Sequence, residues 1–99
     1  MAEPQDVRVE RADDRYVITV DGHEAGFTRF RPDAEGRLVF PHTVVDPAFS
    51  GRGLATTLVA EAMADVAARG ETVVPRCPFV VRYLQTHEVA DLRIDWPDA

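Results

Sequence analysis

The sequence contains no lysine, so arginine is its only permanently cationic residue type, and the net charge over 99 residues is −6. Nucleic-acid phosphates are bound through basic surfaces, so this acidic balance argues against a nucleic-acid partner. A surplus of carboxylates keeps a small protein soluble. We prefer that interpretation to a weaker one, in which the acidic surface attracts a cationic substrate. A lysine nucleophile is excluded.

Cysteine is almost as rare, because Cys77 is the only one. A single cysteine forms no intrachain disulfide, and we expect a reducing, cytoplasmic location. One cysteine and three dispersed histidines lack the spacing of a structural zinc site, so we expect no metal. No apolar run approaches the ~18 residues that span a membrane, so we expect no membrane partner. The first residues do not show a cationic start followed by an apolar stretch, so we expect no secretory signal.

The length suits one domain, and we expect residues 1–99 to form it, with residues 1–6 frayed. Alternating apolar residues predict strands over 7–11, 15–20, 23–30 and 37–45. Asp21-Gly22 follows the second strand, and both residues tolerate the left-handed dihedrals of a tight turn. A second turn is expected over 31–36, which contains proline, aspartate and glycine.

The strand at 37–45 contains two residues that need an explanation. Pro41 has no N–H to donate, so it must lie at a bulge or an unpaired position. His42 is expected to share a strand face with Leu38, Phe40 and Val44. It could act as a base near neutral pH, although a lone histidine on an apolar face is more often a satisfied core residue.

The second half of the chain has helical periodicity. Residues 54–69 place apolar side chains on one stripe of a helix, closed by Gly70: Leu54, Leu58, Val59, Ala62, Met63 and Val66. A short buried strand follows at 72–75, and a second helix runs from Pro78 to about His87 with Cys77 at its N-cap. A last strand is expected within 91–96. The order predicts an α+β domain with a mixed, mostly antiparallel sheet and two main helices.

The loop before the first helix is suited to binding phosphate. Its residues are Ser50, Gly51, Arg52, Gly53, Leu54, Ala55 and Thr56. Two glycines allow a sharp turn and close approach of a ligand, and the free N–H groups of the helix's first turn favour an anion. Arg52 and the Thr56 hydroxyl could add donors. The alternative is a glycine-rich connector that only starts a helix, and two glycines alone do not decide between the two.

Residues 42–91 and their flanks resemble a small GNAT-like family, whose members are little more than the coenzyme A-binding core of the GNAT acetyltransferase superfamily. The matching segments are His42-Thr43-Val44-Val45, Gly51-Arg52-Gly53-Leu54-Ala55, Val73 to Val80 with its Cys-Pro-Phe-Val motif, then Tyr83, His87 and Ala90-Asp91-Leu92. The resemblance implies a splayed mixed sheet and acetyl-coenzyme A as cofactor. It implies that the backbone of Gly51 to Ala55 holds the pyrophosphate, and that Val44 and Val45 pair with the pantetheine arm. We also assign Pro78 to the cofactor site.

This chain departs from the family pattern at two positions that bear on activity. The superfamily loop usually begins with Arg or Gln, where this chain has Ser50. The family usually carries a carboxylate at the position of Val44, so a base supplied there in relatives is missing here. Both departures favour cofactor binding without catalysis.

Three side chains are candidates for catalysis. Cys77 at a helix N-terminus could be an acyl-carrying nucleophile, a small packing residue or part of the cofactor channel wall. Superfamily members often use a tyrosine near Tyr83 as an acid toward the coenzyme A sulfur. The spacing here is one residue short of the usual pattern, so we prefer to interpret Tyr83 as an amphipathic core tyrosine. His42 is the candidate base.

The sequence therefore supports three hypotheses. The first is an N-acetyltransferase that moves an acetyl group from acetyl-coenzyme A to an amine acceptor, either a small molecule or a protein. The second is a catalytically silent acyl-coenzyme A-binding module. The third is an interaction domain with a vestigial pocket.

Overall fold

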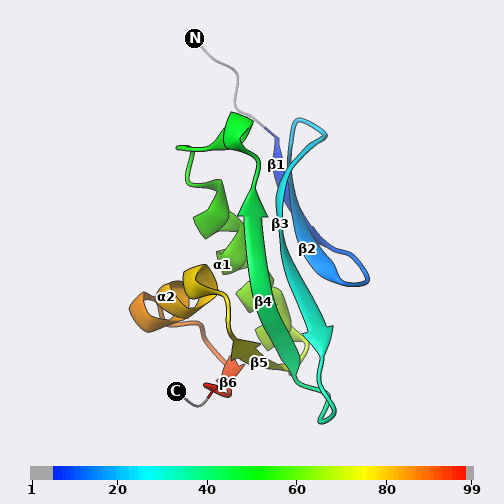
Figure 1. The fold of residues 1–99 in the computed structure, drawn as a ribbon, viewed down its shortest axis with the longest axis vertical. Coiled ribbons are helices and arrows are strands. Elements are labelled where there is room, and N and C mark those ends of the chain that lie inside the picture. The colour runs from blue at the N-terminus through cyan, green and yellow to red at the C-terminus, as the bar shows by residue number, and fades with distance from the viewer. Residues whose placement is uncertain (1–5, 98–99) are drawn as a thin grey trace.

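A six-stranded sheet in the order β1-β2-β3-β4-β5-β6 is the framework of the computed structural model, which describes residues 6–97 (Figure 1). The first four strands are antiparallel, whereas β4 pairs with β5, and β5 with β6, in parallel. The expected α+β architecture is thus confirmed. The elements are β1 Val7–Arg11, β2 Arg15–Val20, β3 His23–Pro32, β4 Leu38–Val45, the 3₁₀ turn η1 Pro47–Phe49, α1 Leu54–Ala68, β5 Thr72–Pro75, α2 Pro78–Thr86 and β6 Arg93–Ile94.

The turn between β2 and β3 has the conformation that its sequence predicts. Asp21 and Gly22 both adopt positive φ, at 51° and 83°. Asp21 also fixes the start of β1, since its N–H donates to the carbonyl of Asp6 and its carboxylate accepts from the Asp6 N–H at 2.9 Å. Asp6 was expected to fray with residues 1–5, but these bonds tie it to the turn. Residues 1–5 lie outside the described part of the chain.

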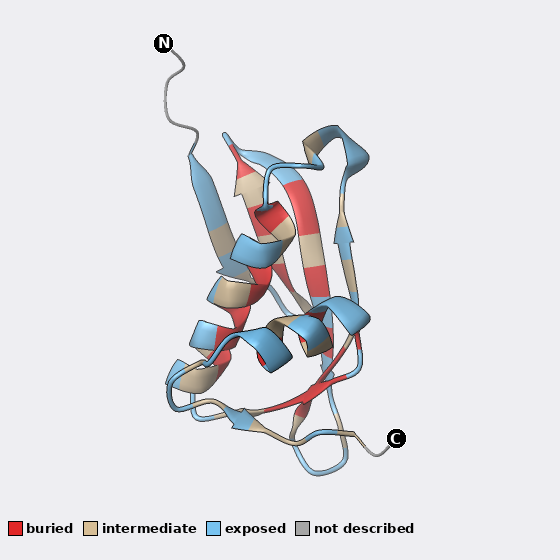
Figure 2. Cartoon of the chain, turned by 90° about the vertical axis from the view of Figure 1, so that its left-hand side faces the viewer, coloured by how far each residue is buried: buried red, intermediate tan, exposed pale blue. Residues whose placement is uncertain are grey.

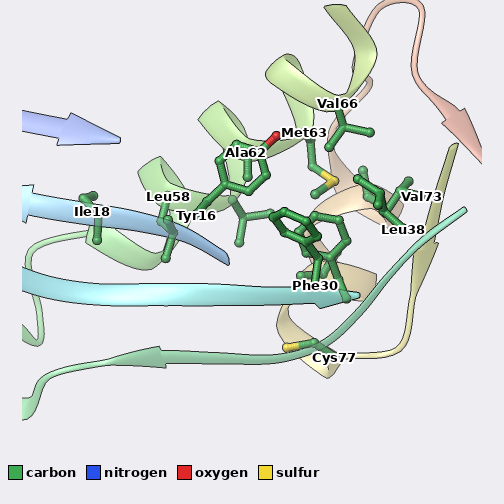
Figure 3. Packing of buried hydrophobic residues seen from close by; sticks show 14 of the residues in the cluster. Tyr16, Ile18, Phe30, Leu38, Leu58, Ala62, Met63, Val66, Val73 and Cys77 are labelled. Carbon is green, nitrogen blue, oxygen red and sulfur yellow. The ribbon is translucent and has the colours of Figure 1, made fainter. Parts of the chain in front are cut away.

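One core lies between the sheet and the two helices. The side chains of Tyr16, Ile18 and Val20 share a buried face of β2, as their alternation predicts. All six apolar residues of the predicted α1 stripe are buried in the cluster that contains this face. Figure 3 shows Leu58, Ala62, Met63 and Val66 among them. Val80 and Leu84 of α2 join the same cluster, so both helices cover the same face of the sheet (Figure 2). The opposite face of β2, β3 and β4 carries neither helix.

A bulge in β4 changes which residues face the core. Arg29 pairs with His42 and Arg31 with Val39, so two residues of β4, Phe40 and Pro41, lie opposite one residue of β3. An extra residue reverses the alternation of side chains beyond it. His42 is consequently exposed on the face opposite Phe40. The expectation that His42 shares the face of Leu38 and Phe40 is wrong for this reason, while the placement of Pro41 at a bulge is confirmed.

Beyond the bulge, β4 and β5 separate. Their pairing covers only Leu38 to Phe40 against Val73 to Pro75. The carbonyl of Phe40 then accepts from the N–H groups of both Arg76 and Cys77, at 3.1 and 2.8 Å. From there the chain turns into α2. β4 continues to Val45, and along this stretch the edge of β4 that faces away from β3 no longer pairs with β5 (Figure 1).

Smaller differences from expectation are local. The segment after β4 contains the turn η1, whose N-cap Asp46 accepts a hydrogen bond from the Ala48 N–H at 2.9 Å. The last strand has only two residues, Arg93 and Ile94. Among residues 6–97, no helix combines the length and the apolarity needed to cross a bilayer.

Candidate functional site

The loop between η1 and α1 depends on its two glycines. Gly51 and Gly53 have φ of 78° and 71°, which residues with a side chain rarely adopt. A Cβ atom added at either position would meet nothing within 4 Å. The glycines therefore provide a left-handed backbone and leave open space beside it. A ligand needs such space to approach the backbone closely.

This open space lies in front of the N-terminus of α1. Gly53 is the N-cap, and no side chain within the described residues caps the helix. The first backbone bond to the Gly53 carbonyl comes from Thr57, at 3.2 Å. The N–H groups of the helix's first turn, Leu54 to Thr56, precede that bond and have no partner in the preceding turn. Together with the helix dipole, they form a site that favours an anion.

A pocket of about 270 Å³ lies over this N-terminus. Seven of the ten residues that the sequence assigns to the cofactor line it: Val45, Ser50, Gly51, Gly53, Leu54, Ala55 and Thr56. Val44, Arg52 and Pro78 do not. Sequence reasoning missed Phe49 and Phe79, which supply the aromatic part of the pocket wall. Phe49 ends η1 and Phe79 lies in the first turn of α2, where it is 36% exposed. No pattern in the sequence links the two.

Two polar side chains of the loop already have local partners. The Ser50 hydroxyl donates to the carbonyl of Pro47 at 3.0 Å. The guanidinium of Arg52 lies 5.4 Å from the ring centre of Phe49. Donors toward the pocket are therefore the backbone N–H groups and the Thr56 hydroxyl, whereas Arg52 is not among the lining residues.

The free edge of β4 presents backbone groups toward the gap that separates it from β5. The N–H of Asp46 donates to the Ala25 carbonyl at 2.7 Å, so in this antiparallel register Val44 also directs its N–H and carbonyl toward β3. By alternation, the polar backbone groups of Thr43 and Val45 point toward the gap. Gly26 permits this close pairing, because a Cβ there would lie 2.5 Å from the Val44 carbonyl oxygen.

Cys77 lies where β4 and α2 meet. It is the N-cap of α2 without a side-chain capping bond, and Pro78 occupies the first turn as expected. The thiol is 3.3 Å from the Thr43 hydroxyl, which is 2.9 Å from the hydroxyl of Thr28. Cys77 is only 5% exposed and belongs to the core cluster. The thiol therefore borders the gap but is covered by core side chains.

His42 and Tyr83, the other catalytic candidates, are not brought together with Cys77. His42 lies on the outer face of the sheet, with its ring 6.4 Å from that of Phe27. Tyr83 lies on α2 and stacks on His87 at 4.2 Å, partly buried against the core. Neither contributes to the wall of the pocket at the glycine loop.

The largest electrostatic perturbations occur at the other end of α1. Arg11 forms a two-point ion pair with Glu71, at 2.7 and 3.0 Å, and also bonds the Tyr16 hydroxyl. That hydroxyl donates to Asp65 at 2.6 Å. These groups border a separate hollow between β1 and α1. Because every member has a partner in the network, we regard it as structural.

Residues 15–92 match the family model described as GCN5-related N-acetyl-transferase. Among solved structures, the fold resembles a crystal structure of ribosomal-protein-alanine N-acetyltransferase from Brucella melitensis biovar Abortus 2308. The TM-score is 0.58 and the identity 22%, over 89% of this chain and 69% of that one, so this likeness concerns the fold alone. No curated protein matches the chain. Because the family model covers most of the sequence, the chain belongs to the GCN5-related N-acetyltransferase family.

Proposed function

We propose that the protein is an N-acetyltransferase that binds acetyl-coenzyme A at the α1 N-terminus and transfers its acetyl group to an amine. One observation carries the proposal: the uncapped N–H groups of α1 face a pocket that two left-handed glycines keep open. A diphosphate fits this donor set, because backbone N–H groups at a helix N-terminus bind anions without needing a cationic side chain. Family membership supports the same cofactor.

The gap between β4 and β5 suits the rest of the cofactor. Amides along a pantetheine arm need backbone partners, and the unpaired groups of Thr43 and Val45 would hydrogen-bond to them as a strand does. Phe49 and Phe79 would bury the apolar parts of the arm. When bound, the thioester supplies an activated acetyl group. The protein's part is to orient this group at the gap, where an amine would reach it from the outer face.

A silent acyl-coenzyme A-binding module is the second candidate. It is favoured by Val44, which stands where the family usually has a carboxylate, and by Ser50, whose hydroxyl is engaged by the Pro47 carbonyl. His42 is exposed on the side from which an amine would arrive, so it remains the proposed base. Turnover separates the two candidates, since both require binding.

Thermal unfolding with acetyl-coenzyme A tests the binding step. Ligand at about 100 times its dissociation constant adds ~2.7 kcal/mol. At ~4–8 °C per kcal/mol for a chain of this size, the melting temperature should rise by on the order of 10 °C. Acetyl-pantetheine, which lacks the diphosphate, should give a much smaller rise at the same concentration. No shift with millimolar acetyl-coenzyme A would refute the cofactor assignment.

A further inference from the structure

The outer face of β2, β3 and β4 carries a row of basic side chains on an acidic protein. The register places Arg15, Arg29 and His42 side by side across three strands. Arg31 continues the basic row along β3, and Arg76 follows β5 across the gap. We call these five residues the basic face. It covers the side of the sheet that neither helix occupies.

Among the described residues, the carboxylates around the basic face form an ion pair with only one of its arginines. Within residues 6–97, Arg29, Arg31 and Arg76 form no ion pair, and all three are exposed. Arg15 pairs with Asp14 at 3.0 Å, and the charge of Asp14 also acts on Arg29. Asp95 borders the same hollow as Arg76. Glu10 and Glu24 lie on the same face, paired with Val17 and Thr19, and the charge of Glu24 acts on Arg15. Arg29 and Arg31 are therefore the part of this face whose charge no ion pair offsets in the described part of the chain, on a protein with a net charge of −6.

An aromatic ring lies beside this charge. Phe27 is half-buried on the same face, and the guanidiniums of Arg15 and Arg29 lie 4.7 and 5.7 Å from its ring centre. Its cross-strand neighbours are Val17 and Val44, which is 36% exposed. An apolar row thus runs next to the basic row. Such a surface can contact the apolar parts of a peptide and its charged groups at the same time.

The basic face adjoins the point where the proposed reaction occurs. The β4 bulge places His42 just beyond Phe40, and the carbonyl of Phe40 accepts from Arg76 and Cys77 at the opening of the gap. Arg31 pairs with Val39 immediately before the bulge. A chain lying across β3 and β4 would therefore bring an amine to the gap while its side chains lie over the arginines.

From this arrangement we infer that the acceptor is a peptide segment rich in Asp and Glu, bound across the basic face with its amine at the gap between β4 and β5. The inference rests on the proposed function. From Arg15 to His42 the basic groups span ~10 Å of sheet, because neighbouring strands are ~4.8 Å apart. A ligand that meets them needs several separated carboxylates, as an extended acidic peptide has. A polynucleotide also carries anions, but it offers no aliphatic amine to acetylate.

Peptide selectivity tests the inference. Three hexapeptides with the same free N-terminal residue and no lysine would carry Glu, Gln or Arg at positions two, four and five. With the protein saturated in coenzyme A, C-terminally labelled peptides would be titrated by fluorescence anisotropy at low and high salt. Thiol release with acetyl-coenzyme A would be measured in parallel. The Glu peptide should bind on the order of 10-fold tighter than the Gln peptide, and added salt should remove this advantage.

Variants identify the surface. Replacing Arg29 and Arg31 together by Gln should remove most of the preference for the Glu peptide, and Arg76→Gln should reduce it separately. The charge reversal Arg29→Glu should move the preference toward the Arg peptide. Arg93→Gln, which removes an exposed arginine on β6, is the matched control and should change nothing. Unchanged melting temperatures would show that the variants remain folded.

The outcomes separate this inference from the proposed function. Absence of any melting shift with acetyl-coenzyme A refutes the proposed function itself. If acetyl-coenzyme A binds but the Glu peptide binds no better than the Gln or Arg peptide, or does not bind at millimolar concentration, the inference is wrong. It is also overturned if a single-stranded oligonucleotide of similar length binds more tightly than the Glu peptide.

Discussion

The thiol of Cys77 lies 3.3 Å from the hydroxyl of Thr43, so the N-cap of α2 and the free edge of β4 are joined by a side-chain contact. The Thr43 hydroxyl also contacts Thr28, which is fully buried on β3. This row of small polar groups crosses the sheet beneath the gap. With the thiol 5% exposed among core side chains, packing accounts for Cys77 more directly than acyl transfer does.

We therefore predict that Cys77→Ala costs about 1–2 kcal/mol of unfolding free energy and leaves turnover per folded molecule nearly intact. Urea unfolding and initial rates, corrected for the folded fraction, measure the two effects. Cys77→Ser is the control of similar size, and it should behave like the alanine variant in rate. An acetyl adduct on Cys77 that hydroxylamine removes, formed as fast as turnover, would show instead that the thiol carries the acyl group.

Much of this architecture can be predicted from local sequence. Asp21-Gly22 specifies its turn through backbone preference, and the α1 stripe from Leu54 to Val66 specifies its buried face through spacing alone. The failure at His42 has a physical cause. Period-2 reasoning assumes an uninterrupted strand, and one extra residue at Phe40-Pro41 reverses every later side chain. Proline signalled the bulge, but its effect on the following face depends on pairing with β3.

The candidate site was predictable where the backbone itself provides the chemistry. Gly51 and Gly53 mark the loop because only glycine readily adopts its dihedrals. The aromatic wall of Phe49 and Phe79 was not assigned, since these residues are 30 positions apart and meet only through the crossover from β4 to β5. Which β4 groups face the gap depends likewise on the register with β3, which the strand's own sequence does not contain.

Gly53→Val is expected to abolish the rise in melting temperature that acetyl-coenzyme A produces. A branched side chain strains the left-handed N-cap by ~1–2 kcal/mol and fills the space in front of the first-turn N–H groups. Gly22→Val is the matched control, because Gly22 also has positive φ and open surroundings but lies in the β2–β3 turn. Both variants should lose similar stability, and only the Gly22 variant should keep the ligand-induced rise. Undiminished binding by a folded Gly53 variant would mean that the glycines only start a helix.

The contact between Tyr16 and Asp65 should hold β2 against α1. The hydroxyl donates to the carboxylate at 2.6 Å, and Tyr16 is only 2% exposed. Removing the hydroxyl therefore takes away a hydrogen bond to a charged group, although Asp65 keeps its bond from Arg69. Tyr16→Phe should cost ~1–3 kcal/mol. Tyr83→Phe is the control, because within the described residues the Tyr83 hydroxyl makes no hydrogen bond, and it should cost less than ~0.5 kcal/mol. Equal losses from the two variants, measured by urea unfolding, would contradict a role for this bond.

The same bond determines how stability should depend on pH. Burial pushes the pKa of Asp65 up, but hydrogen bonds from Tyr16 and Arg69 and nearby arginine charges outweigh it, so the pKa lies below its ordinary value. Such a group contributes stability above its unfolded pKa of about 3.9, and the contribution is lost as pH falls through the lower folded value. For Tyr16, burial and the bond to Asp65 raise the pKa. Its contribution is complete below pH ~10 and is lost as pH rises further.

The unfolding free energy would be measured from pH 2 to 7 and from pH 9 to 11. In both ranges it should depend less steeply on pH in Tyr16→Phe than in the wild-type protein. In acid, Asp65 without the Tyr16 hydroxyl has a folded pKa closer to its unfolded one, so protonation costs less stability. In alkali, the variant has no phenol at this position to ionise. Asp65→Asn separates the two effects, because it should flatten the acid limb most strongly. A Tyr16→Phe profile parallel to the wild-type profile at both extremes would show that the bond does not link ionisation to folding.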